Sequence, residues 1–149
     1  METTESTTSK NLPSTDKWQD LYHRAEGWQS NLAFHRDELR FFNRILDKYF
    51  ILLISDTKLD EMRKMTVDIA HKEYEVQKLT AEFKTLFRNI GEFIDRKSNH
   101  NEEALRQDFN ALERDCNEFD TSFKELKTLV FKITEHMLES EKLKRFLKA

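Results

Sequence analysis

Two His-x-x-Glu pairs, His23/Glu26 and His35/Glu38, are the residues whose types and spacing come nearest to a reactive site in this chain. Helical bundles that bind two iron or manganese ions use glutamate and histidine side chains that point into the core from several helices, usually in the order Glu-x-x-His. Residues three apart share one face of a helix, so each pair could supply metal ligands from one side. Whether either pair can bind a metal in the core depends on which face of the helix is buried.

The apolar residues from Trp18 to Leu53 identify the buried face. They follow one another at alternating steps of three and four, which is the spacing of a heptad seam, and His35 is the one polar member. His23 lies two residues past Leu21 and therefore on the outer face. Because one inward histidine makes no metal centre, we expect no metal site and no cofactor.

No other pattern of reactive residues indicates an enzyme. The chain has 2 glycines, which can hardly form a phosphate-binding loop, and Cys116, its only cysteine, falls in a seam where a small core residue is expected. A three-helix bundle also has no natural deep pocket. We therefore expect no catalytic activity and no small-molecule substrate.

The composition is typical of an all-α protein. The 149 residues are enough for one domain, and 2 Gly and 1 Pro leave few positions for turns. With 25 basic and 28 acidic residues the net charge is -3, which gives no general attraction to nucleic acid. The N-terminus is no secretory signal, and the longest apolar run, YFILLI at Tyr49–Ile54, is far shorter than the ~20 residues of a membrane span. We expect a cytoplasmic protein.

Three heptad seams predict a polar, disordered tail over residues 1–15 and a single bundle over 16–149, with helices at about 16–54, 57–97 and 100–148. Short turns near Ser55–Lys58 and Lys97–Asn101 make the helices run up, down and up, as an elongated antiparallel three-helix bundle of coiled-coil type. The alternative is a compact four-helix domain whose first helix breaks near Gly27. The predicted seams contain Trp18, Leu21, Ala25, Trp28, Leu32, His35, Leu39, Phe42, Leu46, Tyr49 and Leu53; Met62, Met65, Ile69, Lys72, Val76, Leu79, Phe83, Leu86, Ile90 and Phe93; and Leu105, Phe109, Leu112, Cys116, Phe119, Phe123, Leu126, Val130, Ile133 and Met137.

Apolar residues beside the seams widen the predicted core, as expected for helices that each touch two neighbours. They are Phe34, Phe41, Ile45, Phe87, Ile94, Leu129 and Leu138. Gly27 and Gly91 fall inside helices, where each costs about 1 kcal/mol relative to alanine. Both lie near the end that contains Trp18 and Trp28, so we expect them to make room for an indole; the alternative is a hinge.

The polar seam residues His35 and Lys72 predict a polar layer in the core. Antiparallel pairing sets residue i opposite about 111 − i across the first turn and about 197 − i across the second. Glu73, Asp120 and Ser122 then lie within a turn of the level of His35. This layer fits either a buried acid–base group or a device that fixes the helix register, and the second interpretation is favoured because long apolar seams otherwise slip.

One end of the predicted bundle carries the candidate interaction residues. The first turn follows a segment that is apolar on every side, and the third helix should overhang the same end with the basic, amphipathic sequence KLKRFLKA. These features predict a structural or protein-interaction module that binds a protein partner or a second copy. The alternative is weak binding of the overhang to an anionic membrane surface. The candidate residues are Phe50, Ile51, Ile54, Leu143, Arg145, Phe146 and Leu147.

The stretch from Trp28 to Tyr49 resembles the opening helix of small uncharacterised helical proteins of Bacteroidetes-type bacteria. The resemblance rests on a tryptophan followed by Leu-x-Phe and Glu-Leu-x-Phe, here Trp28, Leu32, Phe34, Glu38, Leu39 and Phe41. It covers about a fifth of the chain and implies a helical fold in a bacterial cytoplasm, without an activity.

Overall fold

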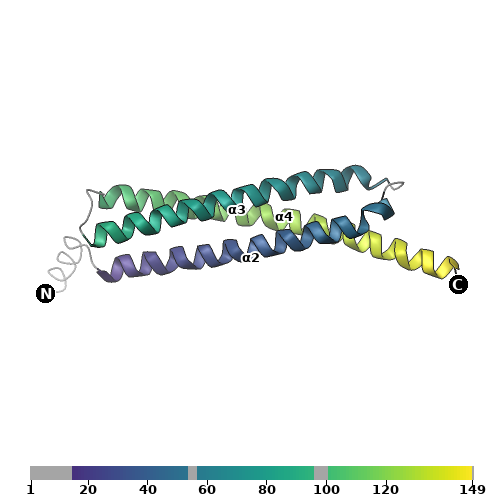
Figure 1. The fold of residues 1–149 in the computed structure, drawn as a ribbon, viewed down its shortest axis with the longest axis horizontal. Helices are drawn as coiled ribbons and strands as arrows, with labels where there is room; N and C mark the ends of the chain where they lie inside the picture. The colour runs from purple at the N-terminus through teal and green to yellow at the C-terminus, as the bar shows by residue number, and fades with distance from the viewer. Residues whose placement is uncertain (1–14, 54–56, 96–100, 149) are drawn as a thin grey trace. The chain divides into compact units, whose positions relative to one another are not determined.

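The computed structural model describes residues 15–53, 57–95 and 101–148, and their side chains except those of residues 15–16, 52–53, 142–144 and 146–148. Three α-helices account for this part of the chain: α2 (Thr15–Leu53), α3 (Leu59–Ile94) and α4 (Glu102–Lys148) (Figure 1). The all-α three-helix bundle predicted from the seams is confirmed. The predicted disordered tail lies outside the described residues, except that Thr15 already begins α2.

Local hydrogen bonds explain where α3 and α4 begin. The backbone N–H of Met62 donates to the carbonyl of Lys58 at 3.0 Å, which closes the first turn of α3. The Asn101 side chain accepts from the backbone N–H of Glu103 at 2.9 Å and so caps α4. Acidic residues occupy the first turn of both helices, where they favour the helix dipole. Residues 54–56 and 96–100, which contain half of the first predicted turn and most of the second, lie outside the described residues.

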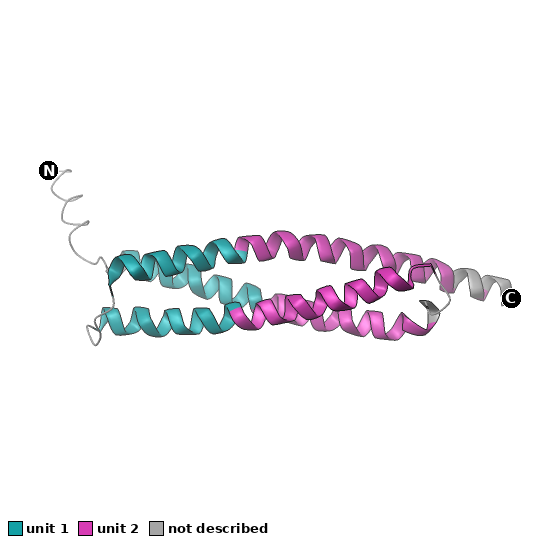
Figure 2. Ribbon diagram, turned by 90° about the horizontal axis from the view of Figure 1, so that it is seen from above, with its two compact units in different colours: residues 1–32, 79–116 teal, residues 33–78, 117–149 magenta. Residues whose placement is uncertain are grey.

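The helices form two compact units (Figure 2). Unit 1 contains α2 up to Leu32, α3 from Leu79 and α4 up to Cys116, whereas unit 2 contains the remaining part of each helix. Each unit is therefore a small three-helix bundle in which α3 runs opposite to α2 and α4 (Figure 1).

The buried core follows the predicted seams. Seven apolar side chains of α2, eight of α3 and ten of α4 are buried among the described residues, and every one of them is a predicted seam residue. Full burial of a large apolar side chain stabilises a fold by about 1.5–3 kcal/mol, so these rows account for most of the stability of each unit. Five seam residues are only half-buried, namely Leu21, Trp28, His35, Lys72 and Phe93.

The flanking apolar residues do not widen the core as predicted. Five of the seven are exposed, namely Phe34, Phe41, Ile94, Leu129 and Leu138, and Ile45 and Phe87 are half-buried. A helix in a three-helix unit buries a stripe that the seam residues already fill, so residues beside the stripe remain at the rim. The prediction of wide seams was wrong, and its failure leaves large apolar groups on the surface.

The surroundings of Gly27 and Gly91 also differ from the prediction that these residues make room for an indole. A methyl group added at Gly27 or at Gly91 would meet nothing within 4 Å. Neither glycine therefore makes room for an indole. No described helix is long and apolar enough to cross a lipid bilayer.

Candidate functional site

His35 lies at the centre of a polar cluster between α2 and α4 in unit 2. Its Nε2 is 3.0 Å from Oδ1 of Asp120, and its Nδ1 is 3.2 Å from Oε1 of Glu38. The second carboxylate oxygen of Glu38 accepts from Nζ of Lys127 at 2.7 Å. An ionised carboxylate only accepts hydrogen bonds, so an imidazolium can donate to both acids whereas a neutral ring can donate to one.

Aromatic rings enclose the His35 imidazole on its inner side. The ring centroids of Phe123 and Phe119 lie 4.2 Å and 5.5 Å from that of His35, and only 13% of the histidine side chain is exposed. The imidazole thus contacts two carboxylates and two phenyl rings. This geometry fits a structural tie between α2 and α4.

Lys72 forms a second polar tie, between α3 and α4 of the same unit. Its Nζ donates to Oγ of Ser122 at 2.6 Å and to Glu75 at 3.1 Å, and it lies 5.3 Å from the centroid of the Phe119 ring. The Ser122 hydroxyl in turn donates to the backbone carbonyl of Phe119 at 3.1 Å. His35 and Lys72 therefore contact the same phenyl ring, each from its own helix.

Glu73 is the predicted layer residue that makes a different contact. It accepts from Nδ2 of Asn43 at 3.1 Å and so joins α2 to α3. Each of the three helix interfaces of unit 2 consequently has its own polar tie: His35 with Asp120, Lys72 with Ser122, and Asn43 with Glu73.

Sequence reasoning missed one polar tie altogether, in unit 1. Glu113 accepts from the indole Nε1 of Trp28 at 3.0 Å and from the guanidinium of Arg24. This bond explains why Trp28 is half-buried, since its polar edge must reach the carboxylate. Glu113 and Arg24 flank the seams, and charged flanking residues facing one another are the signal that could have revealed the tie.

The candidate interaction residues at the end of unit 2 are described only in part. Phe50 and Ile51 are exposed, Ile51 by 77%, and Arg145 is exposed and donates to Glu141 at 2.9 Å. Ile54 and the side chains of Leu143, Phe146 and Leu147 lie outside the described residues. The backbone of α4 continues to Lys148, past the ends of its two neighbours in unit 2 (Figure 1).

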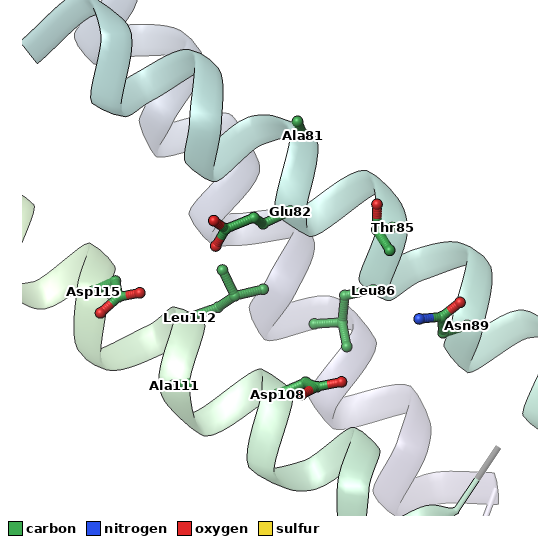
Figure 3. Close-up of a pocket in the computed structure, with 9 residues that line it drawn as sticks. All are labelled: Ala81, Glu82, Thr85, Leu86, Asn89, Asp108, Ala111, Leu112 and Asp115. Carbon is green, nitrogen blue, oxygen red and sulfur yellow. The ribbon is translucent and has the colours of Figure 1, made fainter.

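An open groove of about 320 Å³ lies between α3 and α4 in unit 1 (Figure 3). Leu86 and Leu112 point into the space between the helices (Figure 3). The groove is lined by Ala81, Glu82, Thr85, Leu86, Asn89, Asp108, Ala111, Leu112 and Asp115.

The rim of this groove is acidic. Glu82 comes from α3, Asp108 and Asp115 come from α4, and no basic side chain lines the groove. Within the described part of the chain, none of these three carboxylates forms a hydrogen bond or an ion pair. The groove therefore offers an apolar floor between carboxylates whose charge is not neutralised by the chain itself.

Histidines and acids do not gather into a metal site among the residues that the structure describes, where no three such side chains are placed to hold an ion. His23 contacts only Glu26, at 3.2 Å on the exposed surface.

No family model matches the chain, and neither a curated protein nor a solved structure matches it.

Proposed function

We propose that this protein is a non-enzymatic interaction module whose unit 2 binds the apolar face of a helical protein partner. One observation carries the proposal. Of the eleven large apolar side chains that are exposed in the described residues, nine belong to unit 2. Single exposed apolar residues are ordinary on protein surfaces, but a contiguous group of them marks a binding surface.

Three phenylalanines of unit 2 belong to one surface across α2 and α4, which we call the aromatic row. Phe34, Phe41 and Phe131 are 61%, 53% and 46% exposed. Glu38 lies four residues after Phe34 and three before Phe41, hence on the same face of α2. Glu38 bonds with Lys127, whose Nζ lies 5.8 Å from the Phe131 ring centroid. The Glu38–Lys127 pair therefore lies between the phenyl groups of the two helices.

The aromatic row can pack against a helix of a partner because its members follow the spacing of residues along a helix. Phe34 and Phe41 are one heptad apart, so a docked helix can place apolar residues against both and continue the packing of a bundle. Phe50 and Ile51 extend the apolar surface towards the end of α2. Buried aromatic anchors of this kind dominate the energy of protein interfaces.

A photo-crosslinking amino acid placed at Phe41 tests the proposal, with the same group at Asn110 on the exposed surface of unit 1 as the control. The protein captured from the Phe41 position is then purified and bound to the wild type and to the variant Phe34→Ser/Phe41→Ser/Phe131→Ser. We expect the variant to melt like the wild type and to bind at least ~10-fold more weakly, a loss of about 1.4 kcal/mol.

Equal binding by the two proteins would refute the proposal. It would also fail if the wild type sedimented with anionic vesicles in a salt-dependent way and the variant did not, because the aromatic row would then serve a lipid surface.

A further inference from the structure

We infer that the acidic groove of unit 1 binds the C-terminal segment of a second copy of this chain, residues 142–149. The inference is independent of the proposed partner of unit 2. It rests on the match between a groove with an apolar floor and a helical segment with an apolar stripe, and on the opposite charges that border them.

The C-terminal segment has the composition that the groove requires. It contains Lys142, Lys144, Arg145 and Lys148 and no acidic residue. At about 100° per residue, Leu143, Phe146 and Leu147 form one apolar stripe, with Lys142 on one side of it and Lys144 on the other. A basic residue on each side of the stripe fits a groove that has Glu82 on one wall and Asp108 and Asp115 on the other.

The segment cannot fill the groove of its own chain. Asp115 and Lys142 both lie on α4, which is one continuous helix from Glu102 to Lys148. The helix would have to break before its end could turn back to Asp115. A second copy is therefore required.

Heptad positions favour a two-fold arrangement of the copies. Asp108, Asp115 and Leu143 are separated by multiples of seven residues, so all three hold the same position relative to the heptad seam of α4, which follows the left-handed supercoil of such a repeat. If α4 pairs antiparallel with its copy so that Lys142 is level with Asp115, the reverse pair forms as well, as two-fold symmetry demands. Residues 142–148 then lie level with 109–115, the part of the wall that ends at Asp115.

Leu129 supplies an apolar contact at the centre of this arrangement. The midpoint between residues 115 and 142 falls next to Leu129, which has the same heptad position as Asp115 and is exposed. The dimer would bury two segments, two grooves and the two central leucines at once. Their summed area brings the interface towards the size of a stable dimer although each segment is short.

Charge reversal at both partners tests the inference on the full chain. The groove variant is Asp108→Lys/Asp115→Lys, and the tail variant is Lys142→Glu/Lys148→Glu. Asp20→Lys/Asp47→Lys is the matched control, because both residues are exposed on α2 and have no partner among the described residues. Mass is measured by sedimentation equilibrium over a concentration series.

We expect the wild type and the control to dimerise at low salt and to dissociate at ~1 M salt, where charges are screened beyond about 3 Å. Each reversal alone should give a monomer with unchanged helix content. An equimolar mixture of the two variants should dimerise again, because each tail then meets a groove of opposite charge. A chain that contains both reversals should also dimerise.

Three results would overturn the inference. They are a wild type that stays monomeric at every concentration, a dimer that survives both single reversals, and a mixture of variants that does not associate. A chain lacking residues 142–149 gives an independent check. It should be monomeric and melt at the same temperature as the two monomeric charge-reversal variants, whereas a lower melting temperature with aggregation would mean that the segment covers its own chain.

Discussion

Units 1 and 2 contain segments of the same three helices and differ in which polar groups enter the seams and in how many large apolar groups are exposed. Among the described residues, unit 1 exposes only Tyr22 and Ile94 of its large apolar side chains. Both units place cations over aromatic rings: Arg106 lies 5.5 Å from the Trp18 ring centroid in unit 1, and Lys72 lies 5.3 Å from the Phe119 ring centroid in unit 2. Unit 2 instead brings His35 and Lys72 into its seams and leaves nine large apolar residues at its surface.

The difference shows how one helical pattern can serve two purposes. A seam that admits polar residues loses some hydrophobic stabilisation, but each polar residue restricts the register because it needs a specific partner. Exposed phenylalanine side chains add little to the stability of the isolated protein, because they remain in contact with water. Unit 1 is therefore the better candidate for a plain structural bundle with a charged groove, and unit 2 for recognition of an apolar partner.

The largest expected effect comes from the aromatic core of unit 2. Phe123 is buried and lies 5.9 Å from Phe42 and 5.7 Å from Phe119, measured between ring centroids. Phe123→Ala should lower the free energy of unfolding by about 3–5 kcal/mol, because a cavity replaces a ring that contacts three others. Phe131→Ala, at the exposed row, should cost about 1 kcal/mol or less. Urea denaturation measures both, and similar losses would mean that Phe131 belongs to the core.

The polar tie of unit 1 should have the next largest effect. Glu113→Ala leaves the indole N–H of Trp28 without its acceptor and removes the partner of Arg24, so we expect a loss of about 1–2 kcal/mol. Glu118→Ala, exposed in the middle of α4 and without a side-chain partner among the described residues, is the control and should change stability little. The prediction fails if both variants have the same urea midpoint as the wild type.

The contrast between the two units was only partly predictable from the sequence. The seams were predictable because a heptad repeat determines which face of a helix is buried, and antiparallel pairing placed His35 near Asp120 and Lys72 near Ser122. Glu73 was placed at the right level but bonds with Asn43, because spacing gives the level of a residue and not the direction of its side chain. The exposure of Phe34 and Phe41 depends on how far a neighbouring helix covers the rim of the seam, which the sequence of one helix does not specify.

The acidic groove was likewise beyond sequence reasoning. It is lined by residues of two different helices, Ala81 and Leu86 of α3 and Ala111 and Leu112 of α4. Periodicity identifies each alanine as a surface residue, and only the packed pair of helices shows the recess between α3 and α4.

A smaller effect is expected when the polar seam residue of unit 2 is removed. His35→Leu should leave the free energy of unfolding within ~1 kcal/mol of the wild type or raise it, because leucine suits a seam position. Glu38 keeps Lys127 as its partner, and Asp120 is partly exposed to water. Register specificity should loosen, visible as additional amide peaks in nitrogen–proton correlation spectra. Unfolding of the variant, or loss of a bound metal detected by elemental analysis, would refute the register interpretation.

The smallest effect is expected from replacing glycine by alanine in unit 1, which contains both glycines of the chain. Gly27→Ala should stabilise the protein by about 0.5–1 kcal/mol, since alanine restricts the unfolded chain and a methyl group at this position meets no atom within 4 Å. Gly91→Ala should do the same to a lesser degree, because Gly91 is in the last turn of α3, where its carbonyl accepts from the N–H of Asp95 at 3.0 Å. Thermal melts of the two single variants and the double variant measure the gain, which should be additive. A loss of stability at Gly27 would show instead that α2 needs the flexibility of glycine at this point, and unit 1 would then no longer be the plain structural half of the molecule.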